Sequence, residues 1–233
     1  MERLDKIISA TGKYSRREVK LLVKQGRILV DGRPAAAADV KVDPAVSCIT
    51  IDGQDIGYQR FTYIMLHKPA GVLSAVEDSR QQTVLDLLTP ELRKRGLSPV
   101  GRLDKDTEGL LLLTNDGELT HKLLSPRHHV DKVYYARVEG QLEPADCAAF
   151  AAGMTLGDGL ECMPAGLEIL SPSEALVTLQ EGKFHQVKRM LAARGKPVLY
   201  LKRLSMGSLR LDEHLQPGEF RPLTEEELAA LRP

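Results

Sequence analysis

The first part of the chain alternates short blocks of helical and of strand-like apolar spacing. Residues 3–10 have the apolar periodicity of a helix. Ser15 and Glu18 form the pattern of a capping box, which predicts the start of a second helix. Residues 27–35 follow as a strand, an Asp-Gly turn and a returning strand. These blocks predict a small α/β domain over residues 1–58.

The remainder of the chain, residues 61–233, mixes strand-length apolar runs with helical segments. Pro90 is expected to break or kink the helix that Thr83 begins, and residues 57–62 are expected to form a linker. Strands and helices in irregular order indicate an α+β domain whose mixed sheet is largely antiparallel and flanked by helices. The first expected strand starts at residue 63 and ends in a turn at residues 68–71. Further strands are expected in residues 132–140 and 175–182, with one or two in residues 197–211. The expected helices lie in residues 84–96, 144–153, 184–195 and after Thr224.

Residues 100–124, VGRLDKDTEGLLLLTNDGELTHKLL, combine a charged turn with a strand-length apolar run. Leu110–Leu113 suit a strand covered on both faces, and Asn115 or Asp116 is placed to cap a following helix. The charged turn has three possible interpretations: a solvated connection, a calcium-binding loop, or a turn that carries one functional carboxylate. The calcium pattern fails at its last ligand position, where Asn115 replaces the bidentate glutamate. A polar turn fixed directly onto a buried strand suits the presentation of a functional side chain.

The sequence GRLDKDTEGLLLLTNDGELTHKLL resembles the catalytic-aspartate motif of RNA pseudouridine synthases. The resemblance is to the branch that modifies ribosomal RNA, and the following run SPRHHVDKVY favours its small-subunit subfamily. It implies an isomerase that acts on 16S rRNA, where the family's target is uridine 516, with Asp104 as the catalytic carboxylate. Asp106, Glu108 and Asp116 are then expected to be turn, loop or cap residues.

The same resemblance implies the other catalytic groups. A carboxylate in a cleft stays ionised only if a cation compensates for its burial, and the family supplies that cation from the helix after its EGxxHQV motif, here Lys188. Tyr134 matches the tyrosine of the family's K-x-Y motif and is expected to stack on the uracil, whereas strand alternation points Tyr135 to the opposite face. Arg102 is expected to help flip the base out of its stack or to contact a phosphate. The residues expected to bind the substrate are Arg102, His185, Gln186 and Arg189.

Charge is segregated along the chain, although the formal net charge is zero. Residues 1–33 carry a balance of +5 and residues 183–210 one of +8, whereas residues 211–233 carry −4. Such segregation favours a surface that faces a polyanion. The sequence RLDKIISATGKYSRREVKLLVKQGRILVDGRP resembles an S4-type RNA-binding domain, whose second helix and hairpin meet structured RNA mostly through phosphates. The residues expected to bind RNA are Arg3, Arg16, Arg17, Lys20, Lys24 and Arg27.

Cofactors and metals are not expected. The three cysteines are scattered, which argues against a disulfide framework or zinc site and favours a reducing cytoplasm. The adjacent His128 and His129 would point apart if they lay in a strand, and no third ligand lies at convincing spacing. Uridine and pseudouridine are isomers, so neither a redox cofactor nor ATP is required. No apolar run is long enough for a membrane span. The expected partner is ribosomal RNA or a pre-ribosomal small subunit, and the protein is expected to be a cytoplasmic monomer.

Other functions fit parts of the sequence. A large-subunit (23S) rRNA synthase would share the same architecture. A catalytically silent RNA-binding or ribosome-assembly factor would be expected to lack Asp104, Tyr134 or Lys188, yet all three positions are suitably filled. A glycoside hydrolase would pair Asp104 with a second carboxylate such as Asp106 or Glu108, but it gives no reason for the basic N-terminal segment.

Overall fold

The computed structural model describes residues 1–44, 46–58 and 60–231. The chain forms two compact units, one of Met1–Thr62 with Leu88–Leu97 and one of Tyr63–Leu87 with Ser98–Pro233. The segment Leu88–Leu97 therefore packs with the first unit, although the sequence-based division assigns it to the second domain. Within the expected linker, Gln59 lies outside the described residues.

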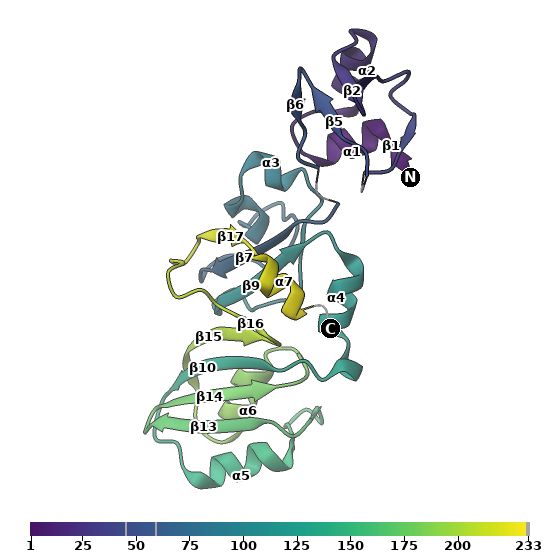
Figure 1. The fold of residues 1–233 in the computed structure, drawn as a ribbon. Helices are drawn as coiled ribbons and strands as arrows, with labels where there is room; N and C mark the ends of the chain where they lie inside the picture. Colours follow the sequence, from purple (N-terminus) through teal and green to yellow (C-terminus); the bar gives the residue numbers. More distant parts are fainter. Residues whose placement is uncertain (45, 59, 232–233) are drawn as a thin grey trace. The chain divides into compact units, whose positions relative to one another are not determined.

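The first unit is a small α/β structure (Figure 1). Four of its strands form an antiparallel sheet in the order β3–β2–β5–β6, and β1 pairs with β4. Apolar side chains from both long helices and the sheet, among them Leu4, Val19 and Ile28, form its buried core. Its elements are β1 (Glu2–Arg3), α1 (Leu4–Ala10), α2 (Arg16–Lys24), β2 (Ile28–Val30), β3 (Arg33–Pro34), β4 (Lys41–Val42), β5 (Ile49–Ile51), β6 (Gln54–Asp55) and α3 (Pro90–Arg93).

Local signals in this unit behave as the sequence predicts. The capping box begins α2, since the Ser15 backbone N–H donates to Glu18 Oε2 at 2.6 Å and the Glu18 N–H donates to Ser15 Oγ at 3.3 Å. Gly12 ends the first helical segment at a φ of +79°, and a Cβ there would overlap the carbonyl oxygen of Glu91. Only glycine therefore allows the end of α1 and the start of α3 to approach this closely.

The helical segment expected over residues 84–96 is broken before Pro90, as its proline predicts. The structure has a 3-10 helix, η1 (Val84–Leu87), and the separate short helix α3. Thr89 caps α3 by accepting a hydrogen bond from the Leu92 N–H, whereas Thr83 bonds to the Asp86 carboxylate. Pro90 occupies the first position of α3, where its missing N–H costs nothing.

The second unit is built on a nine-stranded mixed sheet, which confirms the predicted α+β class. Its main strand order is β13–β14–β10–β15–β9–β7–β17, with β8 paired to β9 and β16 paired to β15. All these pairings are antiparallel except the one between β15 and β9. The strands of the sheet are β7 (Tyr63–Lys68), β8 (Ser98–Pro99), β9 (Glu108–Thr114), β10 (Lys132–Val138), β13 (Gly166–Ser171), β14 (Glu174–Leu179), β15 (Val198–Met206), β16 (Leu209–Arg210) and β17 (Phe220–Pro222). β11 (Met154–Thr155) and β12 (Glu161–Cys162) form a separate antiparallel pair.

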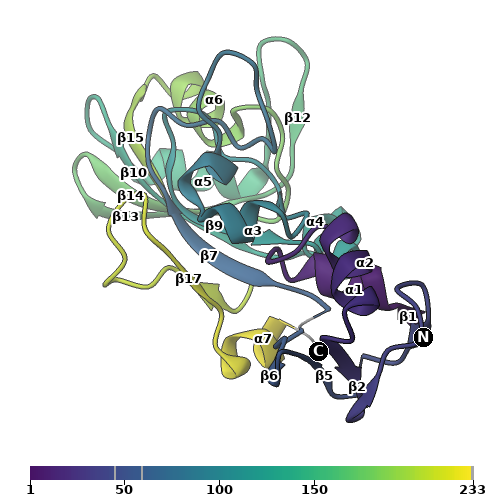
Figure 2. The ribbon, with the colours of Figure 1, turned by 90° about the horizontal axis from the view of Figure 1, so that it is seen from above.

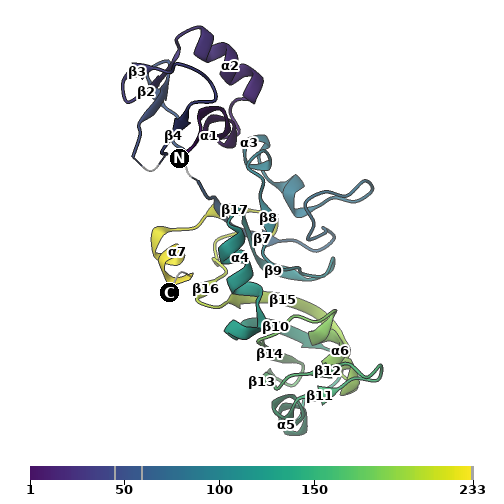
Figure 3. The same cartoon turned by 90° about the vertical axis from the view of Figure 1, so that its right-hand side faces the viewer.

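Helices flank this sheet, with α4 and α7 on one side and α6 on the other (Figure 3). Leu119 and Leu123 of α4 and Leu231 of α7 pack with Leu110 and Leu112 of β9 in one buried cluster. The loop after β7 and the β11–β12 hairpin project on the same side as α6 (Figures 2 and 3). The helical elements are η1, α4 (Gly117–Leu124), η2 (Pro126–His128), α5 (Pro144–Ala152), α6 (Gln186–Ala193) and α7 (Glu225–Leu231).

Three local expectations in this unit have clear outcomes. Of the two candidate caps for α4, Asp116 is the cap, since its Oδ1 accepts from the Leu119 N–H at 3.1 Å. His128 and His129 precede the strand β10, as expected: His128 ends the 3-10 helix η2 and His129 has a φ of +48°. The helix expected from residue 184 begins at Gln186. Within the described part of the chain, no helix is long and apolar enough to cross a membrane.

Candidate active site

The turn that carries Asp104 leads into the most deeply buried strand segment of the second unit. Leu110–Leu113 of β9 are 0% exposed, and β9 lies between β7 and β15. Gly109 has a φ of +107°, and a Cβ there would overlap the backbone of Arg203 on β15. The backbone directly after the turn is therefore fixed against its neighbour, so the turn has a rigid base.

Lys68, at the end of β7, holds this turn from inside the protein. Its side chain is fully buried, and its ammonium donates to the carbonyl oxygens of Asp104 (3.0 Å), Lys105 (3.2 Å) and Thr107 (2.9 Å), as well as to that of Pro69 (3.0 Å). An ammonium has three hydrogens, so these four acceptors share them. Burial lowers the pKa of Lys68 to about 8.

The loop after β7 also holds this turn, through two hydrogen bonds of Ser74. The Leu103 N–H donates to Ser74 Oγ at 3.1 Å, and the Ser74 hydroxyl donates to the Leu103 carbonyl at 2.9 Å. Together with Lys68, this exchange fixes the backbone on both sides of Asp104. The carboxylate is thus presented by a preorganised turn instead of a mobile loop.

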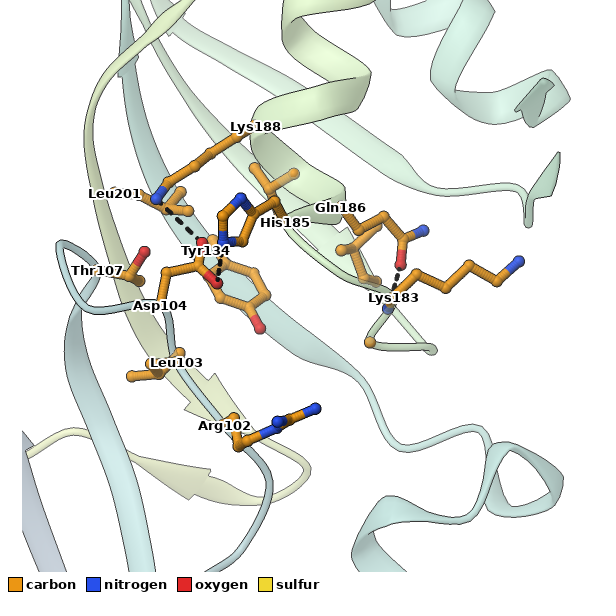
Figure 4. A pocket seen from close by; sticks show the side chains of 13 residues that line it. Arg102, Leu103, Asp104, Thr107, Tyr134, Lys183, His185, Gln186, Lys188 and Leu201 are labelled. Carbon is orange, nitrogen blue, oxygen red and sulfur yellow. Dashed lines mark hydrogen bonds and ion pairs between the residues drawn. The ribbon is translucent and has the colours of Figure 1, made fainter. Parts of the chain in front are cut away.

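The Asp104 carboxylate faces two basic side chains of the segment that begins α6. Lys188 Nζ lies 3.0 Å from Asp104 Oδ2, and His185 Nε2 lies 3.5 Å from Oδ1 (Figure 4). The ion pair expected between Asp104 and Lys188 is therefore present. Lys188 also contacts Asp106 Oδ1 at 2.5 Å, so one ammonium joins two carboxylates of the same turn.

These contacts set the charge of the lysine. Burial acts to lower the pKa of Lys188, but its hydrogen bonds to Asp106 and Asp104 outweigh burial and raise the pKa above its ordinary value. The same hydrogen bond from Lys188 lowers the pKa of Asp106. Lys188 consequently stays a cation at neutral pH, which is the state that stabilises a neighbouring carboxylate.

Tyr134 of β10 completes the pocket around Asp104. It is 8% exposed and lines the same pocket as Asp104 and Lys188, together with the apolar side chains of Leu179 and Leu201 (Figure 4). Tyr135 instead donates from its hydroxyl to Glu174 at 2.6 Å, away from this pocket. The pocket therefore combines a carboxylate, a cation, an aromatic ring and an apolar wall.

The loop before α6 is held by buried polar contacts. Gln186 is 3% exposed; its amide nitrogen donates to Glu181 at 2.6 Å, and its amide oxygen accepts from the Lys183 N–H at 3.0 Å. Glu181 also accepts from the Met163 N–H at 2.8 Å. Gln186, expected to bind substrate, lines the pocket but commits its amide to the fold of this loop.

The two expected substrate-binding arginines are placed differently: Arg102 lines the pocket and Arg189 does not. Arg102 is exposed and extends away from the Asp104 carboxylate (Figure 4). Arg189 forms an ion pair of 2.5 Å with Asp158, which lies between β11 and β12. Arg102 therefore shares the pocket with Asp104 and Tyr134, whereas Arg189 is committed to its ion pair with Asp158.

Comparison with known proteins decides the family. A model of the RNA pseudouridylate synthase family matches residues 62–193, more than half of the chain. The chain belongs to this family. It is therefore a pseudouridine synthase, an isomerase that acts on RNA.

Individual relatives support the same assignment over the whole chain. The uncharacterized RNA pseudouridine synthase YtzG of Bacillus subtilis (strain 168) is 50% identical over 233 residues, covering 98% of each chain. Ribosomal small subunit pseudouridine synthase A of Vibrio cholerae is 41% identical, covering 98% of this chain and 99% of the relative. A crystal structure of a pseudouridylate synthase superposes with a TM-score of 0.70 at 35% identity, covering 99% of this chain and 100% of the other.

The first unit of this pseudouridine synthase contains an S4 domain, which matches residues 2–45. The predicted RNA-binding residues fall into two groups there. Arg3 pairs with Asp5 through two hydrogen bonds of 3.0 and 2.8 Å, and Arg27 pairs with Asp52 in the same two-bonded way. The other predicted residues are exposed along α2 without such a carboxylate partner within the described residues: Arg16, Arg17, Lys20 and Lys24.

Sequence reasoning missed three contributors to the synthase pocket. Lys68 ends an otherwise apolar strand, and a lysine in that position was the available signal. Asp106 was expected to be only a turn residue, but it shares Lys188 with Asp104. Ser74 gave no signal, because its two hydrogen bonds join segments 29 residues apart.

Proposed function

We propose that this pseudouridine synthase isomerises one uridine in small-subunit (16S) ribosomal RNA, with Asp104 as its catalytic carboxylate. The observation that carries the proposal is the 3.0 Å ion pair between Asp104 and Lys188 in the pocket that Tyr134 lines. The relative from Vibrio cholerae, by its name a ribosomal small subunit pseudouridine synthase, supports the choice of RNA. Uridine 516, the expected family target, is the proposed site.

The chemistry requires a carboxylate that remains ionised at the sugar. The bond from the anomeric carbon to the uracil nitrogen breaks, a bond to uracil carbon forms, that carbon loses a proton and the freed nitrogen gains one. An ionised Asp104 acts at the sugar either as a nucleophile or as a base. Lys188 pairs its positive charge with this carboxylate at 3.0 Å, and the turn held by Lys68 aims the carboxylate without reorganisation during the reaction.

Tyr134 is proposed to hold the uracil while it is detached. Its ring lines the pocket beside Leu201 and Leu179, so a flipped base can stack on it with little water between them. The same position allows it to assist the late deprotonation at carbon. Arg102, at the mouth of the pocket, is proposed to occupy the place that the flipped base leaves or to contact a phosphate.

The first unit is proposed to position ribosomal RNA or a pre-ribosomal small subunit through phosphate contacts. The exposed cations of α2 suit that role because phosphate contacts fix register without reading sequence. Docking and catalysis are then carried by separate parts of the chain: domain 1–58 is proposed to dock the RNA, and domain 61–233 is proposed to catalyse the reaction.

The test is to map pseudouridine in ribosomal RNA from cells that lack this protein. We expect one pseudouridine to disappear from 16S rRNA, at uridine 516, with the 23S pattern unchanged. Loss of a 23S pseudouridine would assign the protein to the large subunit instead. An unchanged pattern in both RNAs would contradict the proposal.

A further inference from the structure

Phe184, directly before the catalytic helix segment, leaves a large aromatic ring in solvent. Its exposure is 74%, although the adjacent Glu181, Gln186 and Val187 are buried. An exposed phenylalanine forgoes the favourable free energy of burying its ring. The fold gives no packing reason for an aromatic residue at this position.

The ring is nevertheless held in a defined orientation. It stacks on the His185 imidazole with 3.8 Å between ring centroids and 18° between their planes. His185 itself has the left-handed φ of +50°, and its Nε2 lies 3.5 Å from Asp104 Oδ1. The hydrogen bonds of Gln186 with Glu181 and Lys183 fix the loop that contains both rings. One face of Phe184 is therefore covered by His185, and the other is open.

The surroundings of this open face suit a nucleic acid strand. Phe184 and His185 line a groove together with residues 73–75 of the loop after β7 and residues 102–104 of the turn. Lys183 and Arg102 line the same groove and bring positive charge to it. A flat apolar ring bordered by cations is the combination that binds unpaired nucleotides, through stacking of the base and attraction of the phosphates.

We propose that the Phe184–His185 pair is a stacking platform for the base of a nucleotide next to the target uridine. The proposal rests on the proposed function, because the uridine is placed at Asp104. The His185 ring touches both Phe184, at 3.8 Å between ring centroids, and the Asp104 carboxylate, at 3.5 Å, so a base on Phe184 belongs to a nucleotide close to the uridine in the strand. Stacking there would hold the strand open after the uridine has left its own stack, and it would favour an unpaired neighbour of any base type.

The first measurement is RNA affinity, using a 16S rRNA fragment that contains the target uridine. Phe184→Ala is expected to weaken binding by roughly 5- to 150-fold, the effect of losing one base–aromatic stack. Phe184→Trp, which keeps a stacking ring, is expected to bind within roughly threefold of the native protein. The matched control is Leu199→Ala, because Leu199 is another exposed apolar side chain of the same unit (62%) and does not line the groove.

The second measurement identifies the stacked base. The nucleotide on each side of the uridine is replaced in turn by an abasic residue, and Phe184→Ala is compared with the native protein on each RNA. At one of the two positions, the abasic RNA is expected to bind both proteins with the same affinity. The fluorescence of 2-aminopurine placed at that position is expected to be quenched by the native protein but not by Phe184→Ala. The platform would be overturned if Phe184→Ala lost the same affinity, relative to the native protein, on the intact RNA and on both abasic RNAs. It would also be overturned if Phe184→Ala lost no affinity at all.

Failure of the platform is distinguishable from failure of the proposed function. A native protein that forms pseudouridine but shows no coupling between Phe184 and either neighbour contradicts the platform alone. A native protein that binds the fragment but forms no pseudouridine in it contradicts the proposed function, and the binding titrations then still decide whether Phe184 stacks.

Discussion

The two sides of the pocket are held in different ways. The Asp104 turn is fixed from inside the fold, by the buried strand β9, the buried ammonium of Lys68 and the two hydrogen bonds between Ser74 and the Leu103 backbone. The opposite side, residues 181–188, is fixed by side-chain hydrogen bonds and ends in exposed groups such as Phe184. The rigid side presents the carboxylate, and the more exposed side supplies the cation and the surface that we propose to meet RNA. Variants of the two sides should therefore fail differently.

Short of removing Asp104 itself, the largest effect is expected from Lys188→Met. It leaves Asp104 and Asp106 facing each other without their shared cation, so we expect turnover to fall by roughly 100-fold or more. Lys188→Arg restores the charge with a different geometry and should recover most of that loss. Single-turnover pseudouridine formation by the three proteins is the measurement. Equal activity of Lys188→Met and the native protein would remove Lys188 from the mechanism.

Lys68→Met tests the rigid side, and its expected effect is on stability. It leaves the carbonyl oxygens of the turn without their donor, which should lower the free energy of unfolding by about 3 kcal/mol at neutral pH. Urea unfolding of the variant and the native protein measures the difference. A variant of native stability would show that the turn does not depend on Lys68.

The pH dependence of that difference has a defined sign. The pKa of Lys68 is about 8 in the folded protein and 10.5 in a model lysine, so between these values the unfolded chain binds more protons. The stability of the native protein relative to Lys68→Met should therefore rise from about pH 8 to about pH 10.5, by at most about 1.4 kcal/mol per pH unit. The part of stability that Lys68 contributes in this way is lost as the pH falls through 8. A flat difference across this window would contradict the lowered pKa.

The cations of α2 offer a matched comparison in the first unit. Arg17→Gln and Lys20→Gln should each weaken RNA binding and reduce the slope of log K against log salt by about 0.7–0.9, if each side chain contacts one phosphate. Arg27→Gln should change the slope less, because Arg27 is already paired with Asp52. Binding isotherms at several salt concentrations provide the slopes. Identical slopes for all four proteins would argue against docking through α2.

The smallest effect is expected from Asp106→Asn. Asp106 is 75% exposed at its side chain and competes with Asp104 for Lys188, so its loss should leave stability nearly unchanged and turnover within roughly tenfold of the native protein. The measurement is single-turnover pseudouridine formation by Asp106→Asn, compared with that by Lys188→Met and by the native protein. A loss as large as that of Lys188→Met would make Asp106 an equal partner of Asp104.

Much of this architecture could be predicted because its determinants are local. The Ser15–Glu18 capping box, the Asp116 cap and the apolar run Leu110–Leu113 act through neighbouring residues, so the sequence shows them directly. Tyr134 was chosen through the K-x-Y motif, and strand alternation predicted correctly that Tyr135 faces the other way. Asp104 and Lys188 were found through motifs, although 84 positions separate their numbers.

The missed features depend on contacts between distant segments. Lys68 meets acceptors that are backbone carbonyls of another turn, and a sequence does not show where carbonyls point. The start of α6 was placed two residues early, because the left-handed conformation of His185 depends on a loop held by Glu181 and Gln186. Asp106 resembled an ordinary turn residue until Lys188 was placed beside it.

The central claim is that Asp104 performs the chemistry while other groups bind the RNA. The most direct measurement is pseudouridine formation and RNA affinity in one preparation of Asp104→Asn, compared with the native protein. We predict that turnover falls by more than about a thousandfold, while affinity stays within several-fold, because the amide keeps the shape but loses the charge. Pseudouridine formation by Asp104→Asn at a rate near that of the native protein would contradict the account.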